Sequence, residues 1–274
     1  MVASLRPIGG GPAVSRAKPT TWPRRVLVLG LRIGLLVLIL SIWEWAGRTF
    51  GTPFTFPPFS AVAEAFVQLL GGTELWVSAA ITLESFLFGF GLALVVGIGT
   101  GLLAARSQVF DRLSAVYLRI LMTAPLAPLV PLLIGLFGIG LPSRIALVFL
   151  FSVAVIALNT RTGIQRVDAD LLQMARSFGA GEVLMFRRVR FPGAVPAIMA
   201  GVRLGAGRAV VGMVVAELII VSVGLGRLIN VYRGRFKAAE MFAVVIVILI
   251  IGVAILLIVK WLERRLTAWK GERT

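Results

Sequence analysis

The chain has 274 residues, of which 58% are hydrophobic and only 15% are charged. Soluble domains average about 45–50% apolar and about 25% charged residues, so the composition excludes a soluble domain and predicts an all-α integral membrane protein. The chain has no Cys and no His, which excludes disulfides and the Cys–His and Ser–His nucleophiles. No lysine follows a glycine, which excludes a GxxxxGK[ST] phosphate loop.

The net charge of +16 has two interpretations. It could indicate a nucleic-acid partner, but basic residues in a membrane protein usually lie in cytoplasmic loops and fix its orientation. We therefore expect no nucleic-acid partner. No metal site or other cofactor is expected either.

The amino-terminal part divides into three segments. Residues 1–25 are rich in Gly, Pro and basic residues and predict a flexible cytoplasmic tail. Residues 26–46 predict the first transmembrane helix, in which Arg32 can extend to the inner interface. Residues 47–76 predict an extracytoplasmic segment, where a proline pair precedes an amphipathic pattern that indicates a helix lying on the outer surface.

Five more spans are predicted, because uncharged runs of about 20 residues can cross the hydrocarbon core. In the second span, Gly97 and Gly101 allow two helix backbones to approach closely, either within one subunit or between subunits. The fourth span follows Pro142, with Ser143 as its expected N-cap. The spans are 77–105, 113–139, 143–160, 194–221 and 241–260.

The third span carries Pro125, Pro128 and Pro131. Each proline removes a backbone donor and crowds the carbonyl four residues earlier. In lipid, protein or water must satisfy the freed carbonyls. The segment is therefore either a broken helix beside a transport pathway or a kinked packing helix. Arg119, one to two turns earlier, is either an inner-face anchor or a solute ligand.

The basic residues predict the orientation. Most of them lie in the amino-terminal tail, around residues 106–112, in the loop 161–193 and in a cytoplasmic tail at 263–274, so both termini are expected inside. The opposite side holds Arg48, Arg144 and a basic stretch before the last span. This stretch either docks an acidic patch on an outer partner or is simply solvated. Its members are Arg227, Arg233, Arg235 and Lys237.

The loop 161–193 predicts a helix–break–helix hairpin. Asp168 or Asp170 caps a first helix that runs through Phe178, and Gly179 and Gly181 break it. A second helix is expected to reach Arg190 and to end at Pro192. An exposed apolar stripe on a short hairpin indicates a docking element, and the alternative is an ordinary basic connector.

These residues carry a family resemblance. The spacing of Ala175, Gly179, Val189, Phe191 and Pro192 resembles the cytoplasmic loop signature of ABC importer permeases. That signature begins Glu-Ala-Ala, whereas Gln173 and Met174 stand at the first two positions here. GLFGIGLPSR, ALNTRTGIQRVDADLL, FPGAVPAIMAGVRLG, AEL and GLG are similar, in order and spacing, to the nitrate/sulfonate/taurine branch. The resemblance covers roughly residues 55–262.

The resemblance implies a fold and a function. The fold is the type I transmembrane fold of ABC importers, with six helices and its domain at 77–262. The function is that of an inner-membrane permease that is not itself an enzyme. The partners are a second copy of the chain, a cytoplasmic ATPase dimer that binds the ATP, and an extracytoplasmic solute-binding protein. The ATPase-coupling residues would be Gln173, Ala175, Arg176, Phe178, Gly179, Ala180 and Glu182.

Charges inside the spans suggest where the solute passes, because ionisable groups in lipid usually face a wet cavity or a partner. Arg208 near the midplane either faces the pathway and favours an anion such as a sulfonate, taurine or nitrate, or it pairs with Glu84 or extends to the interface. Glu84 and Glu217 also motivate an alternative function, a proton-coupled carrier or channel. A scaffold protein is a further alternative. The pathway candidates are Arg119, Pro125, Pro128, Arg208 and Glu217.

Overall fold

The structure is a computed structural model that describes residues 21–52, 54–220 and 223–268. In these ranges every regular element is a helix. The predicted tails fall mostly outside the described residues, at 1–20 and 269–274. The elements are α1 (Thr21–Thr49), α2 (Phe59–Leu70), α3 (Thr73–Arg106), α4 (Gln108–Thr123), the 3₁₀ turn η1 (Ala127–Leu129), α5 (Val130–Phe137), α6 (Leu141–Gln165), α7 (Ala169–Ser177), α8 (Glu182–Met185), the π-helical turn η2 (Phe186–Arg190), α9 (Phe191–Ile220), α10 (Gly224–Gly234) and α11 (Ala238–Leu266).

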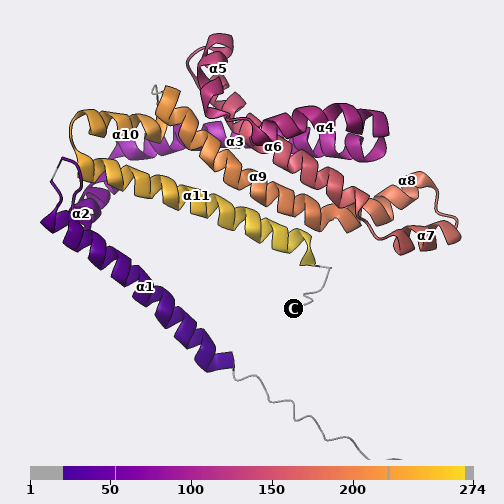
Figure 1. Ribbon diagram of the computed structural model, residues 1–274, viewed down its shortest axis with the longest axis horizontal. Helices are drawn as coiled ribbons and strands as arrows, with labels where there is room; N and C mark the ends of the chain where they lie inside the picture. The colour runs from indigo at the N-terminus through magenta and orange to yellow at the C-terminus, as the bar shows by residue number, and fades with distance from the viewer. Residues whose placement is uncertain (1–20, 53, 221–222, 269–274) are drawn as a thin grey trace, which may run out of the picture.

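Four long helices, α3, α6, α9 and α11, form the bundle, and α6 packs along both α3 and α9 (Figure 1). The contact between α3 and α6 depends on glycines. A Cβ at Gly97 would lie 3.0 Å from the side chain of Ile156, and one at Gly101 would lie 2.5 Å from Cβ of Thr160. The small-residue pair therefore serves packing within one chain, as the first of its two interpretations predicted.

The first helix, α1, diverges from this bundle and packs mainly against α2 (Figure 1). None of its most apolar stretch is buried, which suits a helix surrounded by lipid. The predicted outer helix is present as α2. Its buried residues Val62 and Ala65 pack against Ala243 of α11, so its apolar face is covered by protein.

The third predicted span is broken, as one of its two interpretations expected, and it consists of two helices. α4 ends at Thr123, and Ala124 is extended, with φ −63° and ψ 137°. The chain then continues as η1 and α5, at 99° to α4. Pro125 explains the break, because a proline disfavours the helical conformation of the residue before it.

The fourth span starts earlier than expected, and Ser143 is not its N-cap. α6 begins at Leu141, with Gly140 as the N-cap residue. Ser143 lies in the first turn, where its Oγ donates to the carbonyl of Gly140 at 3.0 Å. A proline in the first turn lacks only an N–H that has no helical partner there, so Pro142 can lie inside the helix.

The hairpin passes into the fifth span without the expected stop at Pro192. After α8, the N–H of Phe191 bonds the carbonyl of Phe186, five residues earlier, in the π-helical turn η2. Pro192 is then the second residue of α9. A proline crowds the carbonyl four residues back in a regular α-helix, and the wider π turn changes this register and lets the helix continue.

The segment before the last span holds a helix that the sequence pattern did not predict. This helix, α10, packs against α3, α9 and α11 through Leu225, Leu228 and Ile229. In Figure 1, α10 and α2 lie at one end of the bundle, and α7 and α8 lie at the other. The described residues contain five helices that are long and apolar enough to cross a membrane, or six with the bent α4–α5 pair.

Candidate functional site

A groove of about 360 Å³ opens between α4, α6 and α9. It combines one guanidinium and one amide with aliphatic and thioether side chains. The lining residues are Met122, Val155, Asn159, Leu204, Gly207, Arg208 and Val211. Nη1 of the half-buried Arg208 lies 3.5 Å from Sδ of Met122. A thioether is a weak acceptor, so most of the hydrogen-bonding capacity of the guanidinium remains for a solute.

Arg208 does not form the predicted pair with Glu84. Glu84 is exposed on α3, and no carboxylate of the described residues lies within 4.0 Å of the Arg208 guanidinium. Arg203, five residues earlier on α9, pairs with Glu263 of α11 at 2.7 Å. The two arginines therefore differ in role, because one is tied to a neighbouring helix and the other faces a groove.

The other candidates on α4 and its proline segment lie near this groove but do not line it. Arg119 is exposed, and its Nε donates to the carbonyl of Ala115 on its own helix at 3.0 Å. Pro125 and Pro128 lie in the break, just after Met122, which does line the groove. The bend of 99° favours a broken helix over a kinked one. The pathway roles of these three residues stay predictions.

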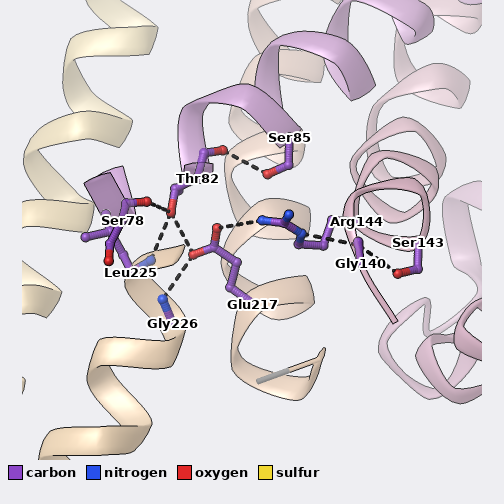
Figure 2. Close-up of polar contacts among 9 residues, drawn as sticks. All are labelled: Ser78, Thr82, Ser85, Gly140, Ser143, Arg144, Glu217, Leu225 and Gly226. Carbon is purple, nitrogen blue, oxygen red and sulfur yellow. Dashed lines mark hydrogen bonds and ion pairs between the residues drawn. The ribbon is translucent and has the colours of Figure 1, made fainter. Parts of the chain in front are cut away.

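Glu217 lies outside the groove, in a packed interior near the end of α9, where it is 2% exposed. Figure 2 shows its carboxylate at the start of α10. Oε2 accepts hydrogen bonds from the N–H of Gly226 at 3.0 Å and from Oγ1 of Thr82 at 2.9 Å. Oγ1 of Thr82 accepts the N–H of Leu225 at 3.0 Å. The first N–H groups of a helix lack helical partners and favour negative charge. At the start of α10, Thr82 and Glu217 supply the acceptors, and the Glu217 carboxylate supplies the negative charge.

Gly224 is required at this junction. Its φ is +82°, in the region that favours glycine, and a Cβ there would overlap the Glu217 carboxylate. On the other side of the carboxylate, Nη1 of Arg144 lies 3.8 Å from Oε1. Arg144 is 4% exposed, because it lies in the first turn of α6 and faces this buried carboxylate. Thr82 and Arg144 also belong to this cluster, although no local sequence pattern marks either residue.

Two of the four outer basic residues have partners on their own chain. Arg227 pairs with Glu74 at 2.7 Å, and Lys237 pairs with Glu240 at 2.8 Å. The hydrogen bond that Nζ of Lys237 donates to the Glu240 carboxylate raises the pKa of Lys237. Arg233 and Arg235 are exposed, and neither has a carboxylate within 4.0 Å in the described part of the chain. Only these two remain as strong candidates for an outer docking surface.

The loop forms the expected hairpin, with Asp168 as the cap. Its carboxylate accepts the N–H of Asp170 at 2.9 Å. At the end of α7, the N–H of Ala180 bonds the carbonyl of Ala175, and Gly179 adopts φ +75°. This hydrogen bond and the left-handed glycine form a Schellman motif. The turn between α7 and α8 is therefore fixed by backbone geometry.

The hairpin presents apolar and charged groups to its surroundings. Phe178 is 84% exposed, and Gln173 is also exposed. Glu182 lies between two arginines, 3.6 Å from Arg176 and 3.8 Å from Arg190. The exposed apolar residues are Leu171, Met174, Phe178, Val183 and Leu184. An exposed apolar patch with charged neighbours is typical of a protein-docking surface.

Sequence comparison places these features in a known family. Residues 97–268 match the family described as "Binding-protein-dependent transport system inner membrane component". The chain belongs to this family of ABC importer permeases. It is a multi-pass inner-membrane transport subunit and not an enzyme. The family implies an ATPase and a solute-binding protein as partners. A scaffold or a proton-coupled carrier is therefore not the function.

The permease is similar to several curated proteins over most of its length. It is 32% identical to the riboflavin transport system permease protein RibX of Chloroflexus aurantiacus, over 95% of this chain and 96% of that one. It is 31% identical to the taurine transport system permease protein TauC of Escherichia coli, over 94% and 96%. It is 32% identical to the putative aliphatic sulfonates transport permease protein SsuC of Bacillus subtilis, over 87% of both chains.

Solved structures support the fold. An amino acid ABC transporter matches with a TM-score of 0.57 and 17% identity, over 76% of this chain and 96% of that one. An inward-facing MetNI methionine ABC transporter matches with a TM-score of 0.55 and 20% identity, over 74% and 97%. These neighbours agree with the expected type I importer fold of six helices. The third helix of this chain is the bent α4–α5 pair.

Proposed function

We propose that this permease conducts a small organic anion along the groove beside Arg208. The observation that carries the proposal is a membrane arginine that faces a groove and has no carboxylate within 4.0 Å in the described residues. A charge near the middle of a span costs about 2.5–3.5 kcal/mol on insertion scales. An anionic solute would offset that cost, and the small Gly207 beside Arg208 leaves room for it.

The remaining lining favours an anion with a carbon skeleton. Val155, Leu204 and Val211 offer aliphatic contacts, and Asn159 can donate or accept one further hydrogen bond. An aliphatic sulfonate meets both requirements, and taurine offers the same anionic sulfonate group beside an ammonium, whereas nitrate has no apolar part. The names of two relatives, which refer to taurine and to aliphatic sulfonates, support this class. Riboflavin, to which the name of a third relative refers, is uncharged.

A second copy of the chain would complete the pathway. In one copy the groove opens at the surface between α4, α6 and α9, so a facing copy would enclose it. With α7 and α8 on the cytoplasmic side, both termini would also be cytoplasmic, in agreement with the distribution of basic residues. The transport unit of each copy would be residues 77–262.

The hairpin of α7 and α8 would couple this pathway to the ATPase. Its turn is rigid and its apolar residues are exposed, as a docking element requires. Phe178 would insert into the ATPase subunit, and Gln173 and Arg176 would flank it. Ala175, Gly179 and Ala180 would fix the shape of the turn, and Glu182 would hold Arg176 and Arg190 together.

The proposal is tested by uptake into proteoliposomes that contain the permease, its ATPase and its solute-binding protein. The probes are taurine, pentanesulfonate, nitrate and riboflavin, each with and without internal ATP. The proposal expects ATP-dependent uptake of at least one of the two sulfonates. ATP-dependent uptake of riboflavin alone, with no sulfonate transported, would contradict the anion pathway.

A further inference from the structure

Four helices meet at the Glu217 carboxylate (Figure 2). α9 supplies Glu217 itself, α3 supplies Thr82, α10 supplies Gly226, and α6 supplies Arg144. All four residues are buried. A relative shift of any of these helices therefore changes a contact of this one carboxylate.

The two oxygens of Glu217 are held differently. Oε2 accepts two hydrogen bonds, of 2.9 and 3.0 Å, that fix it to α3 and α10. Oε1 faces Nη1 of Arg144 at 3.8 Å. Charge-assisted bonds between a guanidinium and a carboxylate are usually about 2.7–2.9 Å long, and the Arg203–Glu263 and Arg227–Glu74 pairs of this chain both measure 2.7 Å. The Arg144–Glu217 contact is thus about 1 Å longer than a closed pair.

The other side of Arg144 is attached to the corner between α5 and α6. Its Nε donates to the carbonyl of Gly140 at 3.3 Å, and Oγ of Ser143 donates to the same carbonyl at 3.0 Å. Gly140 joins α5, the far half of the bent pair, to α6. Arg144 therefore connects this corner with the carboxylate that holds α10.

We propose that Arg144 is a positioning residue that closes onto Glu217 when the importer changes between its inward-open and outward-open states. Closure makes the α5–α6 corner and α10 move together, and opening releases them. The inference rests on the family membership and not on the identity of the solute. It assigns Arg144 and Glu217 a part in transmitting the transport cycle rather than in binding the solute.

The test compares two double substitutions in the assembled complex, reconstituted with its ATPase and its solute-binding protein. Arg144→Gln with Glu217→Gln replaces the open pair by two neutral amides, and the amide oxygen introduced by Glu217→Gln can still accept the N–H of Gly226. Arg203→Gln with Glu263→Gln is the matched control, because it removes a closed pair between two helices. The readouts are the melting temperature of the complex, its basal ATPase and the stimulation of that ATPase by loaded binding protein. The binding protein is loaded with whichever of taurine, pentanesulfonate, nitrate and riboflavin the parent complex transports.

The proposal expects the Arg144/Glu217 double variant to keep basal ATPase within about twofold and to lose stimulation by about tenfold, a typical size for a coupling between sites. The control should keep both activities. Unchanged stimulation in the Arg144/Glu217 variant would overturn the proposal, as would an equal loss in the control.

A single substitution covers the case in which the double variant does not assemble. Arg144→Lys keeps the charge but cannot hold Gly140 and Glu217 at once with a planar fork. It should assemble, keep basal ATPase and lose stimulation several-fold. Stimulation equal to that of the parent would overturn the proposal. A lower melting temperature with an unchanged ratio of stimulated to basal ATPase would also overturn it, because it would show that Arg144 has a purely structural role.

Discussion

The N–H of Leu225 donates a 3.0 Å hydrogen bond to Oγ1 of Thr82, which lies 143 residues earlier in the chain. This bond and the neighbouring bond from Gly226 to Glu217 fasten the start of α10 inside the bundle. The backbone of α10 therefore begins among α3, α9 and α11, where water does not supply acceptors. The polar residues of α3 and α9 supply them instead.

Thr82→Val should destabilise the permease, because it leaves the buried N–H of Leu225 without an acceptor. The expected loss is about 1–3 kcal/mol, the cost of an unsatisfied buried polar group. Thr162→Val is the control, because the hydroxyl of Thr162 bonds only the carbonyl of Leu158 on its own helix. Thermal unfolding of the purified permease measures both, and equal melting temperatures for the two variants would contradict the assignment.

Gly101→Ala should weaken the packing of α3 on α6. The new methyl would lie 2.5 Å from Cβ of Thr160 and 2.6 Å from the carbonyl of Ala157, so the helices must separate. Overpacking of this kind costs about 1–3 kcal/mol. Gly99→Ala on the same helix meets no atom within 4 Å and should be neutral or slightly stabilising. The denaturation midpoints of the two variants compare the sites directly, and a neutral Gly101→Ala would refute the close contact.

Gly179→Asp should uncouple transport from ATP hydrolysis while the permease still inserts and assembles. Gly179 has φ +75°, which strains any other side chain, but its position has open space for a Cβ. The variant should therefore distort the turn between α7 and α8 without disturbing the core. Gly181→Asp adds the same charge at the N-cap of α8, where φ is −69° and Asp is favoured, and should keep coupling. Normal uptake by the Gly179 variant would exclude a coupling role for this turn.

Arg233→Gln with Arg235→Gln should weaken the productive contact with the solute-binding protein. Both residues are exposed at the end of α10, and electrostatic contacts between exposed charges weaken with salt. The apparent Km for the binding protein in stimulated ATPase should rise at low ionic strength and match that of the parent at high salt. Arg48→Gln, which removes an exposed arginine that is paired with Glu44, serves as the control. A Km at low salt equal to that of the parent would contradict a role of Arg233 and Arg235 in docking the solute-binding protein.

The sequence pattern was sufficient for the long helices and for the hairpin turn. Hydropathy predicted where the long helices lie, because an uncharged run of about 20 residues has few alternatives in lipid. The ends were less accurate, since α6 and α11 continue five and six residues past the predicted ends and the third span is divided into two helices. The Asp168 cap and the Gly179 break were also readable, because both depend on neighbouring residues only. The residues of the loop also predicted the permease family to which the chain belongs.

The cluster around Glu217 could not be read from the sequence in the same way. The contact between Thr82 and Leu225 joins distant parts of the chain, and no local period encodes it. The signal that the sequence does offer is Glu217, an acidic residue late in an apolar span and a few positions before Gly224 and Gly226. This pattern suggests a helix whose first N–H groups lie beside a carboxylate. The contact of Arg144 with Glu217 was also not readable, because the orientation rule counts charges near span ends and cannot detect a partner on another helix.

Uptake by Arg208 variants tests the central claim most directly. The measurement is ATP-driven uptake of taurine or pentanesulfonate, whichever the parent transports, in proteoliposomes with matched amounts of assembled complex. Arg208→Gln should lower uptake by at least about tenfold, the size of a lost charge-assisted contact, and should keep basal ATPase. Arg208→Lys should retain part of the uptake, and Arg203→Gln, which breaks the pair with Glu263, should leave anion uptake largely intact. Parental uptake of the sulfonate by Arg208→Gln would contradict the account.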